Sequence, residues 1–327
     1  MNVRAFYRAA TVEDAAAPYN TIQLKVFYPA QLTGSDQEQD MGIVPADSQQ
    51  SPFKVVIFFN GINCGSELYQ WLAVELAKRG LVVITFSWVA ENLPGMVALT
   101  PGVAINMLTP AMYGKAPTAS ALPTLLRELE RLQGEGVLAG LLDLNGIILG
   151  GHSAGGRVAI ESADSRFFPS VVAAFAYGAH TAAITQLGYA AGTILSLPDS
   201  LPLLLIGGTR DGVIANSSHR YGVIWEEATT PVKRTFQEAI TGGRSDSYLL
   251  LLEGANHFSI ADQFDFTTGI PFLDFPATQS EEQLRNLMAE AIGVFIDAHV
   301  RYETTALESL NQLLVSNNPL IALFERK

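Results

Sequence analysis

The sequence predicts an α/β fold in which a mostly parallel central sheet is covered by helices on both faces. Short apolar runs alternate with helical segments along most of the chain, and such runs are typical of strands that are buried on both faces. Hydrophobic residues make up 48% of the 327 residues and charged residues only 16%. This composition supplies enough apolar material for a large core and excludes an intrinsically disordered chain.

The first part of the chain predicts strands, a surface loop and a helix. Residues 22–29 are rich in β-branched and aromatic side chains, which is typical of a strand. Residues 31–52 are polar and acidic and predict a solvated surface loop. Apolar strands over 54–59 and 81–86 then flank a helix over 66–79, whose leucines recur every four residues on one face.

Residues 88–120 interrupt this alternation. The segment is rich in Pro, Gly, Met and Ala and shows no clean period. We expect a small, irregular, lid-like excursion over the carboxyl ends of the strands, with short helices at most.

The alternation resumes with a helix near 122–132 and an apolar strand over 146–149. Further apolar runs predict strands at 171–176, 202–206 and 248–252.

The C-terminal part predicts helices. Ser280 and Gln283 have the spacing of a capping box, which predicts a helix that runs to about His299. We expect residues 304–327 to form one more helix. Because the chain shows no internal repeat and no break in composition, we expect residues 1–327 to form a single domain.

Charge and cysteine content exclude several classes of protein. The chain has 20 basic and 32 acidic residues, a net charge of −12, and no Lys/Arg cluster, so no nucleic-acid partner is expected. The single cysteine, Cys64, excludes an intrachain disulfide and a Cys/Cys zinc site. We see neither a secretory leader nor an apolar run long enough for an integral membrane segment, and we expect a cytoplasmic protein.

Residues 151–155 form the motif G-x-S-x-G, with Ser153 at its centre. The motif follows an apolar strand directly and precedes a helical stretch. A sharp turn between strand and helix exposes the serine hydroxyl above the sheet, and the flanking glycines let neighbouring segments approach. The position therefore predicts Ser153 as a nucleophile.

A serine nucleophile needs a base and a carboxylate that orients the base. His257 follows the strand at 248–252 and is the preferred base, with His180 as the alternative. Asp211 follows the strand at 202–206 and is the preferred acid. The resulting chain order is Ser, Asp, His. Glu253 is the second choice of acid, and two acids after the histidine fit worse, namely Asp262 and Asp265.

Two backbone amides are expected to stabilise a developing oxyanion. One is the N–H of Ala154, directly after the nucleophile. The other comes from the loop after the 54–59 strand, where we favour the N–H of Ile62. Cys64 is close in sequence, but we expect a small buried thiol and not a nucleophile.

With these residues identified, the chain resembles the α/β-hydrolase fold. More narrowly, it is similar to the branch that contains serine dienelactone-hydrolase-like proteins, chlorophyllases, platelet-activating-factor acetylhydrolases and cutinase-like polyester hydrolases. The matching segments are VFYPA, FFNGIN, GLVVITFSW, GGHSAGGR, GGTRDGVI and GANHF, spread over roughly residues 20–300. The resemblance implies a nucleophile at Ser153, an acid at Asp211, a base at His257, and oxyanion donors at Ile62 and Ala154.

The chain departs from this pattern at two places. The usual His-Gly of the oxyanion loop is Asn60-Gly61 here, and the nucleophile is serine where dienelactone hydrolases have cysteine. The resemblance therefore implies a fold branch and not a particular lactone substrate.

We expect a carboxylic ester hydrolase that works through an acyl-enzyme on a hydrophobic small-molecule ester, without a metal or organic cofactor. The alternatives are an acyltransferase or perhydrolase that uses the same acyl-enzyme, or a ligand-binding protein with little turnover. The expected pocket residues are Asn63, Trp88, Met107, Tyr113 and His180. Met96 and Met112, in the same 88–118 segment, would also suit a hydrophobic ester.

Overall fold

A computed structural model describes residues 2–93 and 95–327, which form an α/β structure around one mixed sheet. Its ten described strands have the order β1-β2-β4-β3-β6-β7-β8-β9-β10, and β5 pairs only with β4. From β4 to β9 the neighbouring strands are parallel, whereas β1, β2, β5 and β10 pair antiparallel. The predicted α/β class with a mostly parallel sheet is therefore confirmed. Met1 and Pro94, the latter inside the predicted 88–120 excursion, lie outside the described residues.

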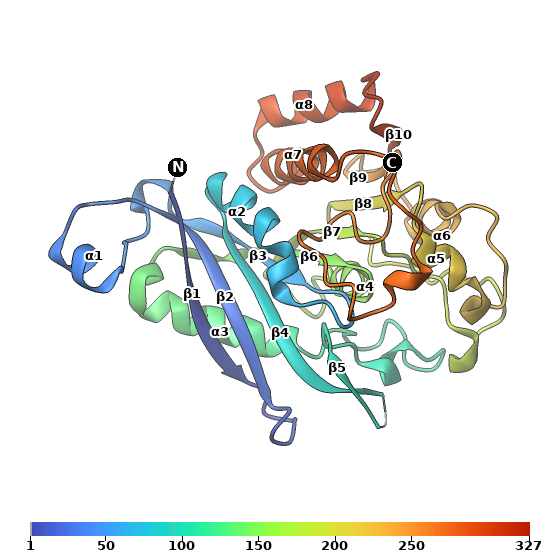
Figure 1. Ribbon diagram of the computed structural model, residues 1–327, viewed down its shortest axis with the longest axis horizontal. Coiled ribbons are helices and arrows are strands. Elements are labelled where there is room, and N and C mark those ends of the chain that lie inside the picture. The colour runs from blue at the N-terminus through green and yellow to red at the C-terminus, as the bar shows by residue number, and fades with distance from the viewer. Residues whose placement is uncertain (1, 94) are drawn as a thin grey trace.

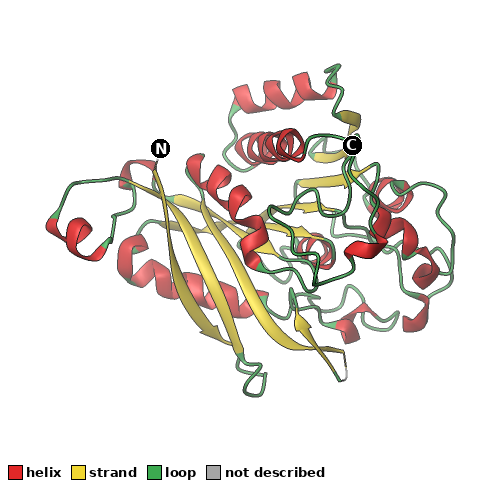
Figure 2. Cartoon of the chain, viewed as in Figure 1, coloured by secondary structure: helices red, strands yellow, loops and turns green. Residues whose placement is uncertain are grey.

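Strands and helices alternate through the middle of the chain (Figures 1 and 2). The strands are β1 Asn2–Thr11, β2 Thr21–Ala30, β3 Phe53–Phe59, β4 Val82–Leu93, β5 Met96–Leu99, β6 Leu142–His152, β7 Val171–Tyr177, β8 Leu203–Gly208, β9 Ser247–Leu252 and β10 Ile321–Arg326. The α-helices are α1 Asp36–Met41, α2 Gln70–Lys78, α3 Leu122–Gly134, α4 Ala154–Glu161, α5 Gly212–Asn216, α6 Thr230–Arg234, α7 Glu281–His299 and α8 Thr304–Leu314. Short 3-10 turns include Ser66–Tyr69 and Ile105–Leu108.

Two hydrophobic layers, one on each face of the sheet, make up the core. Successive side chains of a strand point to opposite faces, and in β3 Val55 and Ile57 pack with α3 and α4, whereas Val56 and Phe58 pack with α2 and α7. All four side chains are almost fully buried. Figure 1 shows the outer helix α8 stacked on α7 beside β9. The near-continuous apolar runs in the sequence follow from this burial on both faces.

The longest described helix, α7, begins where the capping box predicted. The Ser280 side chain accepts a hydrogen bond from the Gln283 N–H at 3.4 Å, and the helix ends at His299. Across the described residues, neither α7 nor any other helix is long and apolar enough to cross a membrane.

Four segments differ from the sequence-based expectation. The 88–120 segment begins with a β-hairpin, because β4 continues to Leu93 and turns back into β5. The 304–327 tail is helical only to Leu314, and its end forms the edge strand β10. The other edge strand, β1, was not predicted. The 31–52 loop contains the short helix α1, which has no buried residue.

The turn between β6 and α4 brings helix α4 against the end of β3. A Cβ atom on Gly155 would lie 2.3 Å from the carbonyl oxygen of Asn60 and 2.4 Å from that of Phe59. Because backbone atoms cannot rotate away as a side chain can, only glycine fits here without displacing β3.

We expect Gly155→Ala to lower the free energy of unfolding by about 1–3 kcal/mol, the usual cost of overpacking a core. Gly134→Ala is the matched control, since Gly134 ends α3 on the surface and a Cβ there would contact nothing within 4 Å. That control should gain up to about 1 kcal/mol from its better helix propensity. Urea unfolding of both variants measures the difference, and equal stabilities would contradict the packing argument.

Candidate active site

A cavity of about 540 Å³ opens at the carboxyl ends of the parallel strands. Its lining comes from the segments that follow β3, β6, β7, β8 and β9, together with β5. Ser153, His257, Ile62 and Ala154 all line it. Ligand sites in open α/β sheets lie at this edge, and the cavity is therefore the candidate site.

Ser153 occupies the sharp turn between β6 and α4. Its backbone has φ 55° and ψ −123°, a conformation that residues other than glycine rarely adopt. The Ser153 N–H donates to the Tyr177 carbonyl at 2.9 Å, which ties the turn to the neighbouring strand β7. Ala154 is the first residue of α4, where the N–H has no acceptor within its own helix. The turn thus presents a hydroxyl and a free amide side by side.

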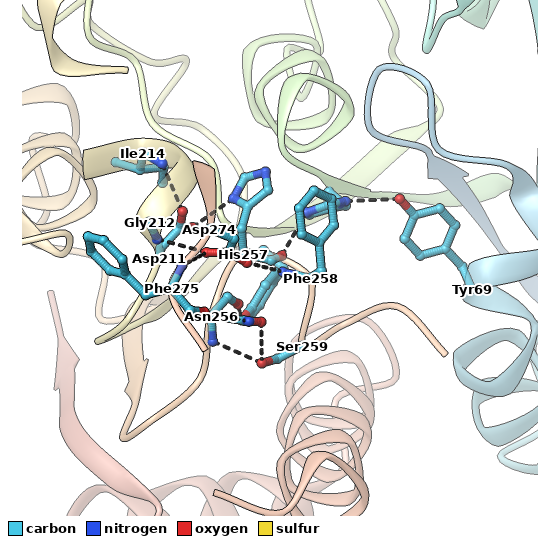
Figure 3. Close-up of polar contacts among 12 residues, drawn as sticks. Tyr69, Asp211, Gly212, Ile214, Asn256, His257, Phe258, Ser259, Asp274 and Phe275 are labelled. Carbon is cyan, nitrogen blue, oxygen red and sulfur yellow. Dashed lines mark hydrogen bonds and ion pairs between the residues drawn. The ribbon is translucent and has the colours of Figure 1, made fainter. Parts of the chain in front are cut away.

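His257 and Asp211 form a buried pair. The distance from His257 Nδ1 to Asp211 Oδ2 is 2.8 Å, and both side chains are almost fully buried (Figure 3). The other carboxylate oxygen of Asp211 accepts the Ile214 N–H at 2.9 Å and caps α5. Because a carboxylate only accepts, Nδ1 carries the proton and leaves Nε2 as the basic nitrogen. No hydrogen bond from Ser153 Oγ to His257 is found in the described residues, although the two residues share the cavity.

The pKa of His257 is set by opposing effects. Burial acts to lower this pKa, but the charge and hydrogen bond of Asp211, with the charge of Asp274 behind it, raise it above the ordinary value. A raised pKa makes His257 a stronger base when it accepts a proton.

The sequence reasoning missed Asp274. Its Oδ1 accepts the N–H of Gly212 at 2.8 Å, and its Oδ2 accepts that of Phe258 at 3.3 Å (Figure 3). Asp274 therefore joins the residue after Asp211 to the residue after His257. Burial, and next the charge of Asp211, raise the pKa of Asp274. No local sequence pattern marks it, because it reaches the pair only through the folded chain.

The loop after β3 is closed by Asn60. The Asn60 side-chain amide donates to the carbonyl oxygens of Gly61 and Cys64, each at 2.9 Å, and the residue is buried. Asn63, at φ 57°, donates its N–H to Leu99 of β5 at 2.8 Å. Within the described residues, the Ile62 N–H between these contacts has no acceptor. The Asn-Gly departure from the expected His-Gly thus keeps a donor free at Ile62.

Asn63 and His180 line the cavity as expected. Trp88, Met107 and Tyr113, the other expected pocket residues, are not part of its lining. Trp88 is buried because β4 continues past it, and its indole N–H donates to Tyr19. The Tyr113 hydroxyl donates to the Ser196 carbonyl at 2.9 Å. Met96, which was also expected to suit a hydrophobic ester, does line the cavity, whereas Met112 does not. Four further side chains of the same excursion line it as well, namely Val97, Val103, Ile105 and Leu108.

Among the described residues, the alternative base His180 has no acidic hydrogen-bond partner. His180 Nδ1 accepts the Ala182 N–H at 3.2 Å, and the ring packs edge-on against Tyr221 and Trp225. Burial, assisted by the charge of Arg157, lowers the pKa of His180 to about 3. This imidazole is a weak base and a neutral part of the cavity wall.

The alternative acids lie elsewhere. Glu253 is exposed, and Asp262 pairs with Arg285 at 3.2 Å. Asp265 accepts hydrogen bonds from Thr267. Of these carboxylates, none is hydrogen-bonded to a histidine.

A buried ion pair in the cavity wall was also missed. Arg157 Nε lies 2.8 Å from Glu161 Oε1, and Arg157 Nη1 donates to the Ala182 carbonyl at 2.9 Å. The spacing of four residues on α4 allows this pair, but only the fold shows that it faces the cavity. Because the two charges compensate one another, the pair leaves little net charge there.

Cys64 is buried as expected, and burial raises the pKa of its thiol to about 11. The residues described here hold no group of three or more His, Cys, Asp or Glu side chains placed to bind a metal ion. A comparison of the chain with protein-family models finds no match, and a comparison with curated proteins finds none either.

Asp274→Asn should lower the pKa of His257, because it removes a negative charge that favours the imidazolium. An NMR titration of the histidine ring signals measures this. Asp265→Asn is the matched control, an exposed acid in the same long segment. An unchanged or higher pKa of His257 in Asp274→Asn would contradict the electrostatic effect of Asp274.

Proposed function

We propose that this protein is a serine hydrolase of the α/β-hydrolase fold that cleaves carboxylic esters through an acyl-enzyme. The observation that carries the proposal is the cavity edge where a strained serine and an Asp-paired histidine meet. Ser153 sits at φ 55° directly before α4, and the His257–Asp211 pair lines or underlies the same cavity. Strained backbone conformations of this kind gather at functional sites. At a turn from strand to helix, this conformation exposes the side chain of a nucleophile above the sheet.

In the first step, Ser153 Oγ attacks the ester carbonyl carbon while His257 Nε2 takes the hydroxyl proton. Asp211 holds the Nδ1 proton and stabilises the imidazolium that forms. The tetrahedral oxyanion accepts hydrogen bonds from the N–H groups of Ile62 and Ala154. His257 then gives its proton to the leaving alcohol, and the acyl group stays on Ser153.

In the second step, water attacks the acyl-enzyme while His257 again acts as the base. The tetrahedral intermediate collapses, the carboxylic acid leaves, and Ser153 recovers its proton. Both steps use only residues of this chain.

The cavity favours an apolar substrate. Apolar side chains such as Val97, Ile105 and Leu108 line it. The lining also contains the buried ion pair of Arg157 and Glu161, whose charges neutralise one another. Apolar lining with few polar groups is typical of sites for hydrophobic ligands. We therefore expect esters with aliphatic acyl chains as substrates.

Ser153→Ala should abolish hydrolysis of p-nitrophenyl esters, because no other activated nucleophile among the described residues faces the oxyanion donors. The expected loss is on the order of 10⁴-fold or more, as for other triad nucleophiles. A panel from acetyl to palmitoyl esters measures the rates, and the chain-length optimum reports the usable depth of the cavity.

Labelling with a fluorophosphonate probe is the control for a correctly formed site. Wild type should be labelled and Ser153→Ala should not. If the variant kept its esterase rate, the nucleophile would be misassigned. A wild type that is neither active nor labelled would favour the ligand-binding alternative.

A further inference from the structure

A chain of buried hydrogen bonds runs behind the site and links the loops that carry its parts. The Gly61 N–H donates to Tyr69 Oη at 3.2 Å. Tyr69 Oη lies 2.9 Å from His152 Nδ1, and His152 Nε2 lies 3.0 Å from the carbonyl oxygen of His257 (Figure 3). Gly61 precedes Ile62, His152 precedes Ser153, and the last acceptor is the backbone of the base itself.

The chemistry of the groups fixes every proton in this chain. A carbonyl oxygen only accepts, so His152 carries its proton on Nε2 and donates it to His257. His152 Nδ1 is then an acceptor, which makes the Tyr69 hydroxyl the donor. The hydroxyl oxygen is left to accept the Gly61 N–H. This arrangement leaves each of the three groups with a partner.

The chain is sealed from solvent. Tyr69 is 1% exposed and His152 is 0% exposed. Burial, and next the neighbouring His257, lower the pKa of His152 well below its ordinary value. Burial likewise raises the pKa of Tyr69 well above the ordinary value. Near neutral pH, His152 is therefore neutral and the Tyr69 hydroxyl is protonated, as the hydrogen bonds require.

We propose that Tyr69 and His152 are positioning residues, which hold the oxyanion loop at a fixed place relative to the loop that carries the base. This inference rests on the proposed function. Tyr69 is not part of the cavity lining, and it acts through the Gly61 amide on the orientation of the Ile62 N–H. His152 borders the cavity, but it is 0% exposed and both of its ring nitrogens are hydrogen-bonded within the protein, so it acts through the backbone of His257. To stabilise an oxyanion, a hydrogen-bond donor must be held within a few tenths of an ångström of its productive position. A direct hydrogen-bonded link between the loop that carries Ile62 and the loop that carries His257 supplies this precision.

Tyr69→Phe is the sharpest test, because it removes one hydroxyl and keeps the buried ring. We expect kcat to fall about tenfold with little change in KM, a partial loss compared with the 10²–10³ for a deleted oxyanion donor. Binding of a tetrahedral transition-state analogue, an alkyl boronic acid, should weaken by the same factor. A merely structural tyrosine would lower stability without this split between kcat and KM.

Tyr177→Phe is the matched control. Tyr177 is also fully buried, its ring packs against His152, and its hydroxyl donates to the Asn256 carbonyl beside His257. In the described part of the chain its hydroxyl makes no hydrogen bond to residues 60–64. Tyr177→Phe should lose about as much stability as Tyr69→Phe. Its ratio of boronate affinity to KM should stay at the wild-type value. If Tyr69→Phe also kept that ratio and its kcat, the positioning role would be overturned.

Two variants of His152 test the other half of the link. Gln carries both a donor and an acceptor, so His152→Gln should retain more kcat than His152→Leu. The effects of His152→Leu and Tyr69→Phe should also be strongly non-additive, since either change breaks the same chain. Additive effects would show that the two residues act separately and would contradict the proposal.

An NMR measurement separates this inference from the proposed function. In Tyr69→Phe, the Ile62 amide signal and the His257 Nδ1 proton signal should both shift, whether or not the protein hydrolyses esters. In Tyr177→Phe, only the His257 signal should shift. If Tyr69→Phe moved the Ile62 signal alone, the loops would not be coupled. Inactivity of wild type with both shifts present would overturn the esterase and leave the link standing.

Discussion

The positive φ of Ser153 is the constraint on which the rest of the site depends. A backbone held in this region costs on the order of 1–3 kcal/mol, so the surroundings must hold it in place. The Ser153 N–H bonds to β7, and α4 lies so close to β3 that only glycine fits at position 155. At Gly151 an added Cβ would lie 2.5 Å from the Gly155 backbone. The glycines of the motif thus serve the packing that keeps the serine strained.

Burial of ionisable groups behind this turn creates a second requirement, which is compensation of charge. Asp211 has its two oxygens occupied by His257 and Ile214, and Asp274 has its two occupied by backbone amides. The two carboxylates raise the pKa of His257 against the effect of its burial. Burial, and next repulsion by Asp211, raise the pKa of Asp274. Both acids therefore contribute to the raised pKa of His257, with Asp211 contributing more than Asp274.

The sequence predicted what local patterns can encode. Central strands such as β3 and β8 are apolar on both faces, and they were found; the half-exposed edge strands β1 and β10 lack that signal and were missed. Ser153 could be proposed as a nucleophile because its motif surrounds it, and Asp211 and His257 could be proposed as its partners because each follows a strand. The structure brings Asp211 and His257 into contact and places Ser153 and His257 at one cavity. Asp274 and Tyr69 could not be predicted, because their hydrogen bonds join segments that lie far apart in the sequence. Trp88 was wrongly predicted as a pocket residue because the sequence does not show that β4 continues beyond residue 86 and buries this side chain.

A parallel sheet brings the ends of its strands to one edge, but it does not set the loops there to sub-ångström accuracy. Here the loops are joined to one another by buried polar groups: Asn60 within the first loop, His152 between the serine turn and the base, and Asp274 between the acid and the base. Each such group costs free energy unless it is bonded on every side. The described bonds satisfy the ring nitrogens of His152 and both carboxylate oxygens of Asp274, whereas Asn60 uses its amide nitrogen and leaves its buried side-chain oxygen without a partner. The links made by His152 and Asp274 hold the loops at this edge in place, and preorganised oxyanion stabilisation requires such fixed loops.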